Sequence, residues 1–505
     1  MYIEPNTVIR ILHNCPLDKT YDHTIYFNSE NAQISYFQSL TKYTFTEQTY
    51  QRVQRGKARV QRKAEDLYDC NYMMFQNSSF GNKWFYAFIT SVEYVNNITS
   101  EISFEIDVMQ TWFFDYNLEE CFVEREHSVT DNIGDNLVPE KLELGDYVSD
   151  DFDATQKLSE RAIVVAATFD KNYNDVGGGY YSGLFSGLCF ITFDNTVDGA
   201  AQCEEFIANA GSKSDGIVSV FLMPKAMVTG VVEPAKVYTV TKTKNLGNLG
   251  GYVPKNNKLF TYPFNFLYVT NLQGNGTAYP YEYFSGGNCS FTLSGDMSCN
   301  PSCILVPNDY KGVVANYDEK MVLSGFPQLG YTTDTFKAWL AQNASSLAVN
   351  ALSTAMNYGM AGGTIGGGVG ASAGATAGLV SGVANTLSQV YQAAIRPNQA
   401  HGGGGSQTMA ALGLLDFAFM HKHIRPEFAR IIDDYFNMYG YATHRVKTPN
   451  RTSRPYWNFV KTIGCVVTGS IPADDMYKIC EIYDRGITFW KNGANVGNYS
   501  LDNRP

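Results

Sequence analysis

Residues 84–109 have the sequence WFYAFITSVEYVNNITSEISFEIDVM. Large apolar side chains alternate with small or polar ones along both halves, and Asn96-Asn97 lies between the halves. Side chains two positions apart share one face of a strand, and a short Asn turn between two alternating runs is a strong hairpin signal. The stretch therefore predicts two antiparallel strands with one apolar face and one polar face.

The polar face of this predicted hairpin is acidic in its second half. It carries Glu101, Glu105 and Asp107, which are separated by four and then two positions. One interpretation is a solvated sheet face, which is the ordinary place for carboxylates. The other is the wall of a channel, and we treat these three residues as its hypothetical lining.

The composition of the whole chain favours a β-rich fold. It has 505 residues, more than one core ordinarily holds, and its 34 Tyr and 31 Phe are residues that favour strands. A net charge of −11 argues against a protein that wraps nucleic acid, because that requires a basic surface. We expect a mainly β protein with α-helical pieces in a long hydrophobic loop and near the C-terminus.

The N-terminus and the cysteines indicate synthesis in a reducing cytoplasm. Residues 1–8 have neither a basic region nor an apolar one, so we expect no signal peptide. Ten cysteines in 505 residues are too few for a disulfide scaffold. The densest group is Cys289, Cys299 and Cys303, and it lacks the C-x-x-C pair or nearby His of a zinc site. A disulfide within this group stays open.

Residues 338–395 contain no Asp, Glu, Lys or Arg. Within them glycines recur every four residues, at Gly362, Gly366, Gly370, Gly374, Gly378 and Gly382. Positions four apart share one face of a helix, and small residues at this spacing are typical of helices that pack together in lipid. Apolar residues flank the glycines at helical spacings: Leu340, Leu347, Leu352, Val383, Leu387 and Val390.

This uncharged segment is a poor helix in water, because each Gly costs about 1 kcal/mol relative to Ala. In hydrocarbon the backbone must satisfy its own hydrogen bonds, which drives the same residues to helix. The segment therefore predicts a membrane-active loop that is sheltered first and inserted later. The alternative is a flexible low-complexity linker.

The remaining segments give no sign of catalysis. No metal-protease or nucleotide-binding motif is present, so we expect no enzyme activity, no metal and no cofactor. Near the C-terminus, apolar spacing predicts a helix that opens at His421 and ends at Gly440, followed by strands around 456–460 and 463–467.

Two sets of motifs resemble the tail knob proteins of small, short-tailed, picovirus-type phages of Gram-positive hosts. The first set is Tyr72–Asn77, Phe80–Phe88, Phe104–Trp112 and Val123–His127. The second set is Tyr439–Tyr441, His444–Lys447, Pro449-Asn450, Asp484–Trp490 and Gly497–Ser500. The resemblance covers about the first 130 and the last 90 residues, with many motifs in the same order.

The resemblance implies a hexamer at the distal end of the virion tail, made in the host cytoplasm. It implies a β-rich tube wall from residues 1–130 and 413–505, inserted β-rich knob modules in 131–335, and a hydrophobic loop in 336–412. The loop would plug the lumen, enter the host cell membrane on ejection and form a pore. Implied partners are upstream tail tube or collar proteins, the host membrane, and double-stranded DNA that passes without sequence-specific binding.

Two other functions stay open. One is a purely structural tail tube or baseplate protein with a receptor-binding middle region, where Tyr180-Tyr181 or Tyr279–Phe284 would stack on a host surface glycan. Core packing is the competing interpretation of these aromatic residues. The other is a tail-borne wall hydrolase, which would require a pair of carboxylates or a metal site.

Overall fold

The computed structural model describes residues 6–48, 56–154, 161–177, 179–181, 184–225, 238–272, 274–295, 301–324, 326 and 417–505. The fold is mainly β, as the composition predicts. The chain forms two compact units. Unit 1 consists of Met1–Glu143, Pro254–Lys258 and Arg430–Pro505, and unit 2 consists of Leu144–Val253 and Leu259–Ala429.

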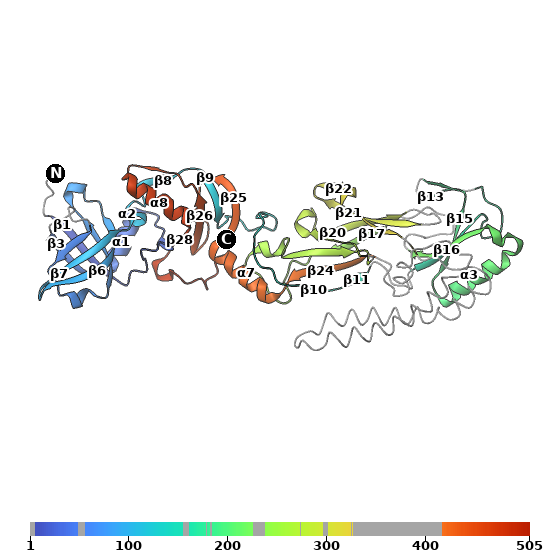
Figure 1. Ribbon diagram of the computed structural model, residues 1–505, viewed down its shortest axis with the longest axis horizontal. Coiled ribbons are helices and arrows are strands. Elements are labelled where there is room, and N and C mark those ends of the chain that lie inside the picture. The colour runs from blue at the N-terminus through green and yellow to red at the C-terminus, as the bar shows by residue number, and fades with distance from the viewer. Residues whose placement is uncertain are drawn as a thin grey trace. The chain divides into compact units, whose positions relative to one another are not determined.

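The first sheet of unit 1 has six antiparallel strands in the order β3-β1-β5-β6-β7-β4 (Figure 1). Their bounds are Thr41–Gln48, Thr7–His13, Cys70–Gln76, Phe85–Asn96, Thr99–Ile106 and Lys57–Val60. The predicted hairpin is confirmed as β6 and β7, with Asn96 paired to Thr99 across the turn. The turn therefore lies at Asn97-Ile98, one residue later than predicted.

Both faces of this sheet are buried at the central strand β5. On β5, Tyr72 and Met74 belong to one apolar cluster, and Met73 and Phe75 belong to another. The edge strands of this sheet are β3 and β4. Tyr43 of β3 and side chains of β4 both pack against the second cluster, so the sheet curls around that cluster (Figure 1). Against the first cluster packs helix α1 (Glu30–Ser39), which Ser29 caps by accepting from the Ala32 N–H at 3.3 Å.

The second sheet of unit 1 brings the two ends of the chain together in the order β2-β28-β26-β9-β25. Its strands are His23–Ile25, Ile487–Trp490, Trp457–Ile463, Cys121–Glu126 and Tyr441–Lys447. Two short strands, β8 (Tyr116–Leu118) and β27 (Val467–Gly469), pair with each other. Along the chain, β8 precedes β9 and β27 follows β26. Helix α8 (Ala473–Arg485) buries an apolar face in the first cluster, and the short helix α2 (Val108–Thr111) follows β7.

One C-terminal prediction is half right. A helix does end before Gly440, but it is α7, Pro426–Tyr439, and the residues from His421 to His423 lie in strand β24 (Ala418–Ile424). Pro426 explains the boundary, because the residue before a proline is disfavoured in the helical region, while proline itself suits the first helical turn. The predicted strand at 456–460 is confirmed as β26, but the one at 463–467 is wrong, because residues 464–466 form the turn between β26 and β27.

Two sheets of unit 2 share one core. The first has the order β10-β24-β18-β19, with β11 also paired to β24. The second has the order β17-β20-β21-β22, with β23 also paired to β21. In the first of these sheets the strands are β10 (Tyr147–Ser149), β18 (Asn265–Thr270), β19 (Gly276–Pro280) and β11 (Asp153–Ala154), together with β24. In the second they are β17 (Tyr238–Thr243), β20 (Asn288–Gly295), β21 (Ser302–Tyr310), β22 (Val313–Ala315) and β23 (Met321–Ser324).

A third sheet of unit 2, β15-β12-β16, is buried on both faces. Its central strand β12 (Arg161–Ala167) turns Val164 toward the shared core and Val165 toward helix α3 (Val197–Asn209). Its neighbours are β15 (Cys189–Asp194) and β16 (Ile217–Pro224). The sequences of β12 and β16 are apolar runs without alternation, which is typical of strands buried on both faces. A two-stranded pair, β13 (Gly179–Tyr181) and β14 (Leu184–Ser186), completes the unit's described strands.

Candidate functional site

The acidic face of the hairpin carries ion pairs. Glu101 accepts from Lys57 Nζ and Arg59 Nε, each at 2.7 Å, and its side chain is 12% exposed. These hydrogen bonds, first to Lys57 and then to Arg59, lower the pKa of Glu101. Glu105 is 46% exposed and pairs with Lys478. In the folded chain, both carboxylates therefore have a cation beside them.

Asp107 does not lie on this face, so its assignment to a channel lining is wrong. It follows the end of β7 and is fully buried, where it caps α2 by accepting from the Met109 N–H at 3.0 Å and the Gln110 N–H at 3.1 Å. The Tyr72 hydroxyl donates to it at 2.8 Å. Burial raises the pKa of Asp107 to about 6. The two-residue alternation ends with the strand, and the sequence does not mark that end.

The predicted membrane-active segment lies outside the described residues. This applies to its glycines, Gly362, Gly366, Gly370, Gly374, Gly378 and Gly382, and to the flanking Leu340, Leu347, Leu352, Val383, Leu387 and Val390. Within the described part of the chain, no helix combines the length and apolar character needed to span a bilayer.

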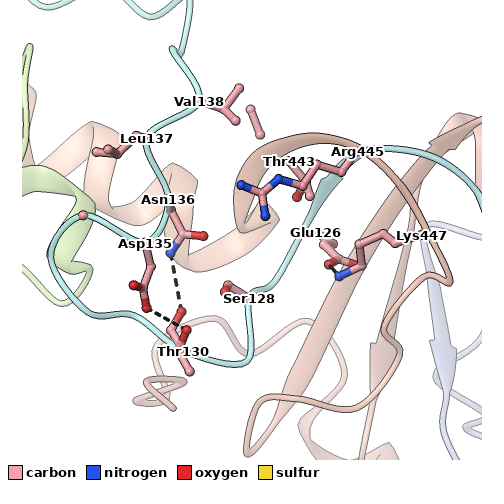
Figure 2. A pocket seen from close by; sticks show the side chains of 12 residues that line it. Glu126, Ser128, Thr130, Asp135, Asn136, Leu137, Val138, Thr443, Arg445 and Lys447 are labelled. Carbon is pink, nitrogen blue, oxygen red and sulfur yellow. Dashed lines mark hydrogen bonds and ion pairs between the residues drawn. The ribbon is translucent and has the colours of Figure 1, made fainter.

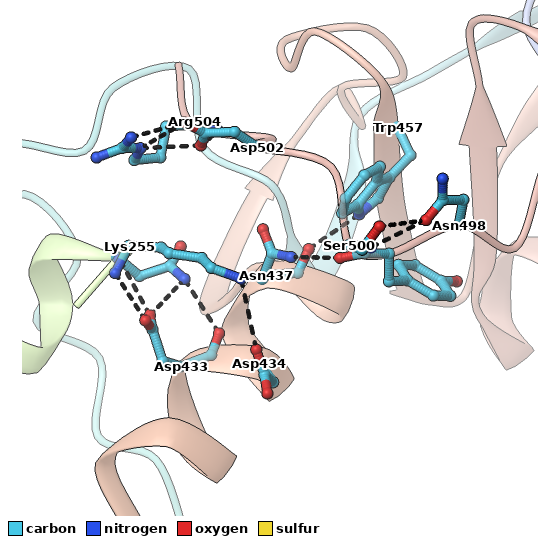
Figure 3. A network of polar contacts seen from close by, with 11 residues as sticks. Lys255, Asp433, Asp434, Asn437, Trp457, Asn498, Ser500, Asp502 and Arg504 are labelled. Atoms are coloured by element: carbon cyan, nitrogen blue, oxygen red, sulfur yellow. Dashed lines mark hydrogen bonds and ion pairs between the residues drawn. The ribbon is translucent and has the colours of Figure 1, made fainter. Parts of the chain in front are cut away.

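A buried polar network holds the five-residue segment Pro254–Lys258 within unit 1 (Figure 3). Asp433 of α7 is fully buried and accepts from the Lys255 N–H at 2.6 Å and the Asn256 N–H at 3.0 Å. The Asn256 side-chain amide donates to the same carboxylate at 2.7 Å. Asp131 accepts from the Asn257 N–H at 2.9 Å, and burial raises its pKa. Two carboxylates thus satisfy consecutive backbone N–H groups where the chain enters the 3-10 turn Asn257–Phe260.

The end of this segment is held by buried charges. Lys258 donates to Glu140 at 2.7 Å, and the two side chains are 3% and 2% exposed. Glu140 also pairs with Arg125 and accepts from the Ala442 N–H at 2.8 Å. Burial lowers the pKa of Lys258. An ion pair this deeply buried is strongly destabilising when broken, because one charge is left without its partner.

Sequence reasoning missed this network. Glu140 and Lys258 are 118 residues apart, and Asn256 and Asp433 are 177 apart. Such separations leave no spacing to recognise. The only sequence signal for this network is the polar run Lys255–Lys258 between apolar stretches. Such a run is equally typical of an ordinary loop.

A cavity of about 640 Å³ opens beside this network in unit 1 (Figure 2). Its carboxylates are occupied: Glu126 pairs with Lys447, and Asp135 accepts from Thr130 at 2.8 Å and Asn132 at 3.0 Å. The hydrogen bond from Thr130, followed by that from Asn132, lowers the pKa of Asp135. A carboxyl with a lowered pKa is a poor proton donor at neutral pH, so Asp135 is a poor candidate for the acid of a hydrolase.

The other sequence candidates are placed as follows. Tyr279, Tyr281 and Phe284 are buried in the core of unit 2, so their proposed stacking on sugars is wrong, whereas Tyr283 is 40% exposed. The side chains of Tyr180 and Tyr181 lie outside the described residues. Cys289 is a buried free thiol, Cys303 is buried, and Cys299 is outside the described part. Among the described residues, no group of His, Cys, Asp or Glu has the arrangement of a metal site.

Comparison with known proteins identifies the class first. Residues 5–117 match the N-terminus of the caudoviral major tail protein, so the first sheet of unit 1 belongs to a phage tail protein. Residues 233–504 match the C-terminal domain of the tail knob protein gp9 of Bacillus phage phi29. The chain belongs to the family of phage tail knob proteins, and it is a structural component of the virion tail.

Similarity to curated relatives extends along the whole chain. The tail knob proteins gp9 of Bacillus phages PZA and phi29 are 26% and 25% identical, and each alignment covers 98% of this chain and 98% of the relative. The solved structure of the bacteriophage C1 tail knob protein, gp12, has a TM-score of 0.68 and 15% identity. That match covers 98% of this chain and 99% of the other, and it shows that the fold is shared. The resemblance inferred from the motifs is therefore confirmed.

Proposed function

We propose that six copies of this chain form the distal tube of the tail, through which double-stranded DNA leaves the virion. The hydrophobic loop of each copy plugs the lumen before ejection and enters the host cell membrane as part of a pore afterwards. Upstream tail tube or collar proteins would hold the hexamer in the tail. Membership of the tail knob family supports this place in the virion.

The observation that carries the membrane step is the composition of residues 338–395. Fifty-eight consecutive residues without an ionisable Asp, Glu, Lys or Arg, with glycines every four positions, suit lipid and suit water poorly. The composition is less apolar than that of a constitutive membrane anchor, because Gly, Ala, Ser and Thr dominate it. It therefore supports a segment that is inserted conditionally.

Electrostatics supports passage of DNA without binding. Six copies, each with a net charge of −11, would carry −66 together. A lumen with this sign of charge repels phosphate, so the duplex would move without specific contacts. Of the three residues first considered for the lining, Glu101 and Glu105 remain, and their cationic partners reduce the charge that they would present.

Charge placed in the glycine-rich segment tests the membrane step. The double substitution Gly370→Glu and Gly374→Glu should abolish dye release from liposomes by purified tails, since each buried carboxylate costs several kcal/mol in hydrocarbon. The matched control is Gly403→Glu in the linker-like residues 402–406, which should release dye as the unchanged protein does. Equal dye release by all three proteins would contradict the pore. It would leave the alternative in which the segment only fills space.

A second candidate function, glycan binding by the middle region, is favoured by one surface of unit 2. Tyr283 and Tyr317 are 40% and 58% exposed. Lys311 lies 5.5 Å from the centre of the Tyr283 ring and pairs with Glu319, the last residue of the 3-10 turn that Tyr317 begins. Exposed aromatic rings beside charged groups suit a sugar face. Loss of virion adsorption in Tyr283→Ala and Tyr317→Ala, with dye release unchanged, would support this function.

A further inference from the structure

Three cysteines that are far apart in sequence come together in unit 1. Cys121 begins β9, Cys465 lies in the turn between β26 and β27, and Cys480 lies on α8. All three are free thiols, and Cys465 and Cys480 are partly exposed whereas Cys121 is buried. The tail function derived above uses none of them.

The backbone fixes this arrangement through Asp484, one helical turn beyond Cys480 on α8. Its carboxylate accepts from the Cys465 N–H at 2.9 Å, the Gly464 N–H at 3.1 Å and the Thr462 hydroxyl at 2.7 Å. Residues four apart lie on the same helix face, so the turn is tied to the face that carries Cys480. The β9–β26 register, with Phe122 opposite Ile463, brings Cys121 to the same turn.

Cys465 and Cys480 both pack against the first apolar cluster of unit 1. Burial raises the pKa of each thiol, and for Cys465 the negative charge of Cys480 and Cys121 raises the pKa further. Cys480 is more accessible than Cys121.

We propose that Cys480 and Cys465 form a disulfide when the tail leaves the reducing cytoplasm and meets a hydroperoxide. The Cys480 thiolate attacks one peroxide oxygen, so an S–O bond forms, the O–O bond breaks, and the other oxygen leaves as hydroxide or alkoxide and takes a proton. The Cys465 sulfur then attacks the Cys480 sulfenic acid. An S–S bond forms, and the hydroxyl leaves with the Cys465 proton as water. Two thiols lose two electrons in total, and one peroxide gains them.

The disulfide would join α8 to the turn that Asp484 already holds. The hydrogen bonds of Asp484 already hold this turn against the helix, so little reorganisation of the backbone is required. The proposal rests on the place of the protein in the virion tail, since exposed thiols stay reduced in cytosol and oxidise outside it. It does not depend on the hexamer or on the pore, so their failure would leave it standing.

Peptide mapping of the full chain tests the proposal. The reduced protein is treated with hydrogen peroxide, denatured in iodoacetamide and digested without reductant. The expected result is a linked pair of peptides that contain Cys465 and Cys480, lost on treatment with dithiothreitol, with Cys121 recovered in alkylated form. Recovery of Cys465 as an alkylated thiol, at peroxide doses that convert Cys480 to sulfinic acid, would overturn the proposal.

Two variants separate the roles of the thiols. Cys480→Ser should give no linked pair, and Cys121→Ser should give as much as the unchanged protein. Thermal unfolding under reductant establishes that each variant is folded. If Cys480→Ser does not fold, the alkylation rates of the three thiols in the native, reduced protein test the mechanism instead. Cys480 should react first of the three. A slower reaction of Cys480 than of Cys121 would refute the mechanism.

Discussion

Removing the buried cation of Lys258 is the sharpest test of the network that holds Pro254–Lys258. In Lys258→Met, Glu140 keeps Arg125 and the Ala442 N–H but loses the 2.7 Å partner in a site where it is 2% exposed. Breaking a buried pair by removing one partner costs about 3–5 kcal/mol. We expect the lower end of that range, about 3 kcal/mol, because part of the carboxylate's hydrogen bonding survives.

The matched control lies three residues earlier in the same segment. Lys255 pairs with Asp434 at 3.7 Å, and the two side chains are 38% and 58% exposed. Such a pair contributes about 0–1 kcal/mol, so Lys255→Met should be nearly neutral. Urea denaturation followed by tryptophan fluorescence measures both, since Trp457 and Trp490 are buried in unit 1. A difference in unfolding free energy below 1 kcal/mol between the two variants would refute our account of the network.

Two further predictions concern stability. The folded-state pKa of Asp107, about 6, lies above its unfolded value, so the folded protein loses stability as pH rises from about 4 to 6. Asp107→Asn should remove this slope in unfolding experiments across that range, and an unchanged slope would assign it to other groups. Gly440→Ala should destabilise by more than the roughly 1 kcal/mol expected for a positive φ alone, because its Cβ would lie 2.2 Å from the Glu126 carbonyl oxygen. The control Gly497→Ala has φ +83° with no atom within 4 Å, and an equal loss in both would exclude the steric cause.

Local patterns predicted local structure. The alternation around Asn96 predicted β6 and β7. The same reasoning failed at the ends of elements. Asp107 continues the alternation in sequence, yet it caps a helix, and His421 to His423 continue the spacing of α7 backwards, yet they pair in β24. A cap and a strand partner depend on tertiary contacts that spacing cannot contain.

The polar contacts of unit 1 were out of reach for a different reason. Asp433 and Glu140 are acidic residues like many others in the sequence, and only their burial against Asn256 and Lys258 distinguishes them. The motif resemblance, in contrast, identified the family because it uses residue order and not geometry.

The return of the chain at Pro254–Lys258 restricts how this protein can be recombined. Unit 2 is encoded as two separate blocks, with five codons for unit 1 between them. A chimera that exchanges residues 144–429 as one cassette therefore also replaces the partners of Asp131, Glu140 and Asp433. Exchange of knob modules between related phages should succeed when Pro254–Lys258 keeps the PKNNK sequence of the recipient. It should fail when this segment is taken from a donor with different contacts.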